Sequence, residues 1–378
     1  METKRMSIQV FKPQFRTEEC LKELRECLEI GWTGLGFKTV EFEKLWCEYT
    51  GLPHAHFLNS ATAGLHLAVH ILKTRCKWRD GDEIITTPLT FVSSNHVILY
   101  ENLKPVFADV DNYLCLDPDE VLKRITPRTR CVMFVGIGGN IGQYHRIVKL
   151  CRERDIKLIL DASHMTGTRY KGVHVGGDAD ATIFSFQAVK NLPTGDSGML
   201  CMAETDDDTR ARKLAWLGIS SDTYARSKQG NYKWMYDVDE VGYKYHGNSV
   251  MAAIALVQLR YVDVDNAYRR QIAAWYRERF SGNPKIHMVA IPEGCESATH
   301  FFPIMVKNRD SLVDTLSKNE ISVGVHYRDN TEYPMYSHGK GSCPHAAELS
   351  RMLITLPIHL ALSKSDINRI SDLVIAHA

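Results

Sequence analysis

Lys190 is the residue of this chain whose setting most suggests chemistry. It lies in the stretch FSFQAVKNLPTGDSGML, between an apolar run and a glycine-rich turn. A lysine held in apolar surroundings has a lowered pKa and can act as a nucleophile or carry protons. Asp161 ends an earlier apolar run, and His164 follows three residues later. A carboxylate at the end of a buried strand needs a cation or hydrogen-bond donors beside it, although a helix cap would account for Asp161 on its own.

Three further features offer groups that a ligand with a phosphate and a flat ring would need. Ala61 and Thr62 lie among the small residues of 59–64, which follow a predicted strand and open a predicted helix. Backbone N–H groups at such a helix end suit a phosphate. Ser185 lies at a strand-to-loop transition and Phe91 at the end of another predicted strand. Taken singly, these residues also fit an ordinary helix start, a turn hydroxyl and core packing.

Pyridoxal phosphate (PLP) requires all of these groups at once. It needs a lysine for the Schiff base, an acid that keeps the pyridine nitrogen protonated, phosphate donors at a helix N-terminus and a cover for its ring. The spacing from Asp161 to Lys190 fits two neighbouring strand ends of one sheet. We therefore predict a PLP site in which Asp161 serves the pyridine nitrogen.

The glycine-rich segment 136–142, GIGGNIG, offers a competing dinucleotide site. It follows a predicted strand, and Asp161 ends the next one about 20 residues on, where a ribose-binding acid would lie. However, its third glycine comes one residue late for GxGxxG, and at least three strand–helix units precede it. We expect a loop that needs positive φ or close backbone approach. Packing against a ligand and a true nicotinamide site stay as alternatives.

Strand and helix patterns alternate through the first two thirds of the chain. The predicted strands are 54–58, 83–87, 106–110, 130–135, 158–160, 181–186 and 199–202. The predicted helices are 18–30, 39–49, 62–73, 93–100, 117–125 and 146–154. Short buried strands separated by helices imply an α/β fold with a mainly parallel sheet that is covered on both faces.

The pattern changes after Leu217. Residues 220–237 are polar, aromatic and irregular, and a long, bent helix is predicted over 249–280. Beyond it we predict strands at 300–306 and 322–326 and helices at 311–319, 344–353 and 364–376. These elements suffice for a smaller C-terminal α+β domain. We expect a large PLP-binding domain over 1–245 and a small domain over 246–378.

Composition narrows the classes of protein to consider. The 378 residues include 46 Lys and Arg against 45 Asp and Glu, without a basic run, so nothing indicates a nucleic-acid partner. The N-terminus lacks an apolar signal core, and no stretch approaches the roughly 20 apolar residues of a membrane helix. None of the ten cysteines forms a CxxC pair. We expect reduced thiols in a cytoplasmic protein, with no disulfide frame and no metal site.

The chain resembles the DegT/DnrJ/StrS family of PLP-dependent sugar aminotransferases. The resemblance covers nearly the whole chain and rests on GWTG at 31–34, VEFE at 40–43, NSATAGL at 59–65, PLTFV at 88–92, PVFADVD at 105–111, DASH at 161–164, SFQAVKN at 185–191, GYKYHGN at 242–248, VHY at 325–327 and LPIH at 356–359. It implies the fold-type I architecture of aspartate aminotransferase, with a mainly parallel, mixed sheet of seven strands in the large domain.

The resemblance also implies roles for single residues. Lys190 would form the internal aldimine, Asp161 would pair with the pyridine nitrogen and Phe91 would stack on the ring. The phosphate would be held by Ala61, Thr62, Ser185 and, from the partner protomer, Asn248. His164 and Gln187 would lie near the cofactor, and the substrate would meet Tyr243, Tyr245, His326 and Tyr327. Gln187 stands where the family often has histidine, and Gly138 replaces a common tyrosine, which bears on substrate fit more than on the cofactor.

These roles imply a transaminase that works as a homodimer with sites shared between protomers. L-Glutamate would convert PLP to pyridoxamine phosphate (PMP), and a keto sugar, expected to be nucleotide-linked, would then receive the amino group. Lys190 would act as general base and then as general acid. The alternatives are a sugar dehydratase, in which histidine replaces the lysine in some relatives, a non-catalytic regulator with the same fold, and an NAD-binding oxidoreductase.

Overall fold

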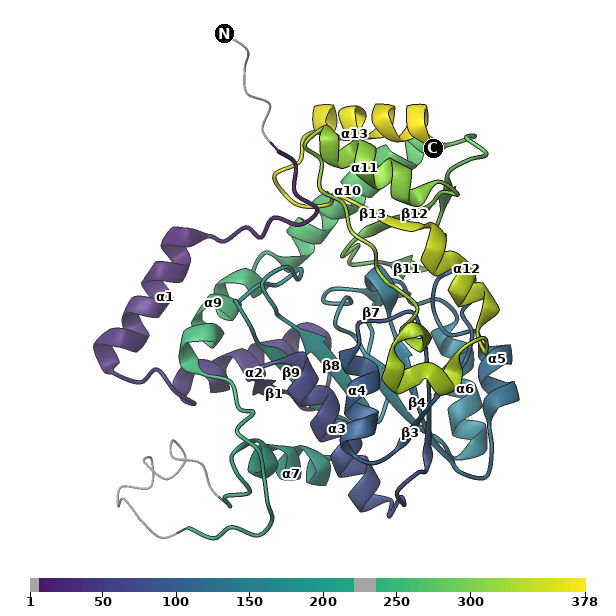
Figure 1. The fold of residues 1–378 in the computed structure, drawn as a ribbon. Coiled ribbons are helices and arrows are strands. Elements are labelled where there is room, and N and C mark those ends of the chain that lie inside the picture. The colour runs from purple at the N-terminus through teal and green to yellow at the C-terminus, as the bar shows by residue number, and fades with distance from the viewer. Residues whose placement is uncertain (1–6, 221–235) are drawn as a thin grey trace.

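A mixed sheet of seven strands forms the centre of the molecule (Figure 1). The structure is a computed structural model that describes residues 7–220 and 236–378. The strands of the sheet are β1 (His56–Leu58), β2 (Glu83–Thr86), β3 (Lys104–Phe107), β4 (Thr129–Val135), β5 (Lys157–Asp161), β8 (Ala181–Ser185) and β9 (Gly198–Met202). Their order is β1-β9-β8-β5-β4-β2-β3, and within this sheet β9 runs antiparallel to both neighbours while the other pairs are parallel. The expected mainly parallel, mixed sheet is confirmed.

Helices cover both faces of this sheet because both faces are apolar. The flanking helices are α1 (Thr17–Ile30), α2 (Phe37–Thr50), α3 (Ala61–Arg75), α4 (Ser93–Tyr100), α5 (Pro118–Arg124), α6 (Tyr144–Arg154), α7 (Thr205–Ala215) and α9 (Ser249–Leu259). Successive strand residues point to opposite faces. Ile84 thus packs in one core with α3, α4 and α7, whereas its neighbour Ile85 packs in another with α2, α6 and α9. The near-continuous apolar runs of the strands follow from this double burial.

The C-terminal part builds its own core around a second, three-stranded sheet. Its elements are α10 (Val262–Phe280), β10 (His287–Met288), β12 (Phe302–Met305), α11 (Arg309–Lys318), η2 (Asn330–Glu332), η3 (Pro334–Gly339), α12 (Pro344–Met352), β13 (Leu353–Leu356) and α13 (Lys364–His377). The strand order is β10-β12-β13. The N-terminal segment joins this part, since Ile8 pairs with Ile321 and is buried in the same core. The division of the chain at residue 246 stays a prediction; α9 itself packs against α1 and α2.

Two predicted elements in the C-terminal part are wrong in detail. The helix expected over 249–280 is two helices, α9 and α10, which are separated by a turn at Arg260 and Tyr261. The Tyr261 hydroxyl donates to Glu19 of α1, and the Arg16 guanidinium lies over the Tyr261 ring. Residues 322–326 form no strand; Gly324 makes a single bridge to Thr355 before the chain turns away.

Several elements were not predicted. They are α7, β10, β13, the turns η1 (Ile137–Gly139), η2 and η3, and the short strands β6 (Arg169–Tyr170), β7 (Val173–His174) and β11 (Cys295–Glu296); these last three form a separate three-stranded sheet. Most of the irregular segment expected over 220–237 lies outside the described residues. Residues 7–220 and 236–378 contain no helix that is both long and apolar enough to cross a bilayer.

The glycine-rich segment is a tight turn, as the loop interpretation predicts. Gly138, Gly139 and Gly142 have φ values of 62°, 89° and 48°. A Cβ on Gly139 would lie 3.0 Å from the carbonyl oxygen of His164. The glycines therefore allow the turn after β4 to pack closely against the segment that carries His164.

Candidate active site

A cleft opens at the carboxyl ends of the parallel strands, where the polar residues predicted from sequence gather. Its volume of about 870 Å³ suits a ligand of cofactor size. The predicted residues that line it are Ala61, Thr62, Phe91, Asp161, His164, Ser185, Gln187, Lys190, His326 and Tyr327. Residues that sequence reasoning missed also line it, including Phe11, Thr90, Asp196, His300, Asn330 and Tyr333. The fold thus joins strand ends of the large sheet to segments from both chain termini.

Lys190 presents its amine to this cleft from the turn that follows β8. The Lys190 amide donates to the Gln187 carbonyl (2.8 Å), and the Gln187 side chain accepts from the Val189 amide (3.1 Å). Burial lowers the pKa of Lys190 to about 8, with the charge of Asp161 opposing the shift only in part. Within the described part of the chain, no hydrogen bond or ion pair engages Nζ. The amine is therefore desolvated and available.

Asp161 is the last residue of β5 and is 4% exposed. Ser94 Oγ donates to its Oδ2 (2.7 Å), and the Ser163 amide donates to its Oδ1 (3.1 Å). Ser94 comes from α4 and was not predicted, since nothing in a serine 67 positions away signals this contact. The two donors hold the carboxylate at the cleft wall, and no cation among the described residues forms an ion pair with it, so it can receive a protonated ring nitrogen.

The start of α3 forms the other end of the cleft. Ser60 caps the helix by accepting from the Ala63 amide (3.1 Å), and Ala61 and Thr62 open its first turn, where backbone N–H groups have no intrahelical acceptor. A Cβ on Gly198 of β9 would lie 2.6 Å from the Ala61 nitrogen. Gly198 is also the cross-strand partner of buried Ser185. This close approach brings the Ser185 hydroxyl to the helix start, as an anion site requires.

Phe91 stands at the mouth of the cleft with 60% of its surface exposed. Its ring centroid lies 6.3 Å from that of Tyr327, which reaches the cleft from the C-terminal part. An exposed aromatic side chain beside a polar cleft gains apolar contact when a flat ligand covers it. The placement agrees with the ring-stacking role that was expected for Phe91.

Three neutral imidazoles surround the Lys190 amine. His164 Nδ1 accepts from the Gly138 amide (3.3 Å), so Nε2 carries the proton and donates to the Tyr327 hydroxyl (3.2 Å). Burial and then the charge of Lys190 hold the pKa values of His164 and His300 well below the usual range. The same two causes lower the pKa of His326 to about 4. At neutral pH the site therefore holds hydrogen-bonding rings rather than further cations.

Three predicted residues do not line the cleft of their own chain. Asn248 caps α9, accepting from the Met251 amide (2.9 Å). Tyr243 and Tyr245 stack on each other (4.9 Å between centroids) and pack beside His66, whose Nδ1 lies 3.1 Å from the Tyr245 hydroxyl. The expectation that Tyr243 and Tyr245 meet the substrate therefore finds no support within one protomer. A contribution of these residues to a partner's site stays a prediction.

The residues present fit PLP. An available amine, a carboxylate held by two donors and a serine beside open helix amides lie around one cleft. Within residues 7–220 and 236–378, no three His, Cys, Asp or Glu side chains gather as a metal ion would need. The donor set thus matches an aldehyde, a ring nitrogen and a phosphate.

Comparisons with known proteins agree with this geometry. The model of the DegT/DnrJ/EryC1/StrS aminotransferase family matches residues 14–375. The spore coat polysaccharide biosynthesis protein SpsC of Bacillus subtilis is 33% identical over 94% of each chain. The aminotransferase TlmJ from Streptoalloteichus hindustanus is 32% identical, with a TM-score of 0.90 over 98% of each chain. Spr1654 from Streptococcus pneumoniae, solved in a PMP form, is 28% identical, with a TM-score of 0.89 over 97% of this chain and 98% of its own.

These matches confirm the predicted fold type and cofactor class. The fold is that of PLP-dependent aminotransferases, and PLP is the cofactor. The nicotinamide alternative for the glycine-rich segment is wrong, because that segment is a packed turn within an aminotransferase fold.

Proposed function

The chain belongs to the DegT/DnrJ/EryC1/StrS aminotransferase family, and from this premise we propose that it transfers an amino group from L-glutamate to a keto sugar. The proposed acceptor is a nucleotide-linked 3- or 4-keto-6-deoxy sugar, and the product is the corresponding amino sugar. The observation that carries the proposal is the Lys190 amine, which is desolvated and has no hydrogen-bond partner among the described residues, in a cleft with a held carboxylate.

The residues that line the cleft have separate roles in the proposed reaction. PLP, when bound, supplies an electron sink for the substrate carbanion. Asp161 would accept a hydrogen bond from the protonated ring nitrogen, and the helix start with Ser185 would hold the phosphate. Lys190 removes a proton from the substrate as general base and returns it as general acid. A pKa of about 8 suits both tasks near neutral pH.

The sugar acceptor is supported by the similarity to SpsC, whose name assigns it to polysaccharide biosynthesis. It is also supported by the lining of the cleft, where Asp196 and Tyr333 offer hydrogen-bonding groups of the kind that sugar hydroxyls need. A cytoplasmic location is proposed on the ten free cysteines, which suit a reducing compartment.

We further propose a homodimer in which Asn248 and the tyrosines beside it complete the partner's site. The support is that Tyr243, Tyr245 and Asn248 carry the family-like motif yet lie outside the cleft of their own chain. Sedimentation at several protein concentrations tests this proposal. A monomer with full cofactor affinity and activity would contradict it.

Two alternative functions are compatible with the same fold. A dehydratase of this family is disfavoured because Lys190 is present, and a non-catalytic regulator is disfavoured because the lysine, the acid and the phosphate-binding residues all line one cleft. Incubation with glutamate separates these cases from a transaminase, which converts bound PLP to PMP with a change in absorbance.

The decisive experiment offers the holoenzyme a panel of 3-keto and 4-keto nucleotide sugars with glutamate, read by mass spectrometry. A product in which NH₂ and H replace the ketone oxygen is expected for at least one member. Lys190→Ala serves as the matched control and should give none. If glutamate yields PMP but no sugar in the panel is aminated, the aminotransferase stands and the proposed acceptor class is wrong.

A further inference from the structure

Asn191, directly after Lys190, has a buried side chain whose orientation is fixed by its partners. Its Nδ2 donates both protons, to Asn266 Oδ1 (2.6 Å) and to the Ala298 carbonyl (2.7 Å). Asn266 is fixed in turn, because its own Nδ2 donates to the Thr166 carbonyl (2.9 Å). The Asn191 oxygen is therefore left as an acceptor, which identifies the amide orientation without ambiguity.

That oxygen lies 2.9 Å from His300 Nδ1, so the imidazole must donate from Nδ1. Nε2 of the neutral ring then carries a lone pair and no proton. Burial, with the nearby charge of Lys190, holds the pKa of His300 well below the usual range, and the ring is neutral at physiological pH.

The ring of His300 is held in place from both sides. It stacks on His164 (4.6 Å between centroids, 20° between planes) and on Phe11 (5.3 Å, 8°). His300 lines the cleft, and its Nε2 is not one of the fully buried side-chain nitrogen and oxygen atoms that lack a hydrogen-bond partner. With Nδ1 turned toward Asn191, the edge that carries Nε2 is the one that reaches the cleft.

We propose that His300 is a specificity-determining residue, whose Nε2 accepts a hydrogen bond from a hydroxyl of the keto sugar, and that Asn191 is the positioning residue that fixes this tautomer. The inference rests on the proposed function. A hydroxyl can donate to Nε2, whereas the carboxylates of an amino-acid donor can only accept. The lone pair thus favours the sugar in one half-reaction and offers nothing to the carboxylates in the other.

The first test compares the two half-reactions in single turnovers of the holoenzyme. For His300→Phe, which keeps an aromatic ring between Phe11 and His164, kcat/KM for the sugar relative to kcat/KM for glutamate should fall about 10- to 100-fold, as expected for a lost hydrogen bond in a desolvated site. His145→Phe, on an exposed position of α6, should leave the ratio unchanged. An unchanged ratio for His300→Phe overturns the inference.

The second test reads the tautomer without cofactor or substrate. In ¹⁵N spectra of the apoprotein, His300 should show a protonated Nδ1 and an unprotonated Nε2 at neutral pH. Asn191→Ala should mix the tautomers, and an Nε2-protonated ring in the unchanged protein would overturn the inference. If the unchanged protein aminates no sugar, the proposed function fails and the inference with it; if it does so but the half-reaction ratio is insensitive to His300, only the inference fails.

Discussion

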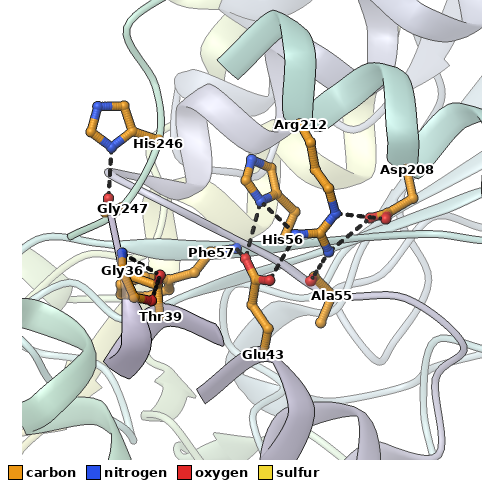
Figure 2. Close-up of polar contacts among 10 residues, drawn as sticks. All are labelled: Gly36, Thr39, Glu43, Ala55, His56, Phe57, Asp208, Arg212, His246 and Gly247. Atoms are coloured by element: carbon orange, nitrogen blue, oxygen red, sulfur yellow. Dashed lines mark hydrogen bonds and ion pairs between the residues drawn. The ribbon is translucent and has the colours of Figure 1, made fainter. Parts of the chain in front are cut away.

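The chain places charged side chains in two different settings, and the contrast separates structure from chemistry. Beside β1, Arg212 donates to Glu43, Asp208 and the Ala55 carbonyl, and Glu43 also accepts from the Phe57 amide (Figure 2). In the cleft, the Lys190 amine has no such partner within the described residues.

The pKa values follow this difference. Burial would raise the pKa of Glu43, but Arg212 and His56 outweigh it and hold that pKa below the usual range. For Lys190, burial dominates and Asp161 only opposes it. A buried charge with hydrogen-bonded partners of opposite charge is costly to disrupt. A charge without such partners in a desolvated setting costs stability and is a candidate for chemistry.

The largest effect is expected from replacing Lys190 by methionine, which keeps the length of the side chain and removes the amine. Turnover should fall by at least about 10³-fold, since proton transfer by a positioned group contributes that much. The apoprotein should at the same time gain stability, because a half-buried amine without a partner among the described residues is lost. Calorimetry and glutamate half-reactions measure the two changes; a lower Tm would show that the amine has a stabilising partner.

Glu43→Gln should change stability in the opposite direction. It leaves the Arg212 guanidinium without its carboxylate at that position and should cost about 2 kcal/mol, as for a hydrogen bond to a charged group. Calorimetry of the apoprotein should give a lower Tm, while the glutamate half-reaction of the folded holoenzyme stays near that of the unchanged protein. A half-reaction slowed as strongly as by Lys190→Met would remove the distinction between the two regions.

The pH dependence of cofactor capture sharpens the contrast further. Only the unprotonated amine attacks an aldehyde, so the rate at which the apoprotein captures PLP should rise about tenfold per pH unit below a midpoint near 8 and then level off. Because the pKa is lower in the folded state, the unfolded chain binds more protons between pH 8 and about 10.4, and stability should rise with pH in that window. A midpoint near 10.4 would mean that Lys190 is hydrated like a surface lysine.

The smallest effect is expected from removing one hydrogen bond to the Asp161 carboxylate. Ser94→Ala removes the donor to Asp161 Oδ2 while the Ser163 amide still holds the other oxygen. The affinity for PLP should fall about three- to tenfold, because the lost hydrogen bond acts on the cofactor only through the orientation of Asp161. Ser317→Ala, at an exposed position of α11 outside the cleft, is the matched control. Equal affinities for both variants would mean that Ser94 does not orient Asp161.

The sequence was sufficient where one short segment carries both an element and its chemistry. Asp161 at the end of an apolar run and Lys190 after the next one follow from strand patterns, and the structure brings both into one cleft. The helix over 93–100 was also placed correctly from its local sequence pattern.

The sequence was insufficient where a contact joins distant segments. His300 meets Asn191 across 109 positions, and Ser94 meets Asp161 across 67. Such serines and histidines have no local pattern, since their roles depend on tertiary packing alone. The break at Tyr261 was hidden for the same reason, because the side-chain contacts of Tyr261 are with Glu19 and Arg16, which are distant in the sequence.

The cleft draws its two walls from separate stretches of the chain. Asp161 and Ser185 end strands of the central sheet and Lys190 lies in the turn after β8, whereas His300, His326 and Tyr327 come from the C-terminal part. If the proposed roles hold, substitutions in that later stretch would change which acceptor binds while the residues that hold PLP stay unchanged.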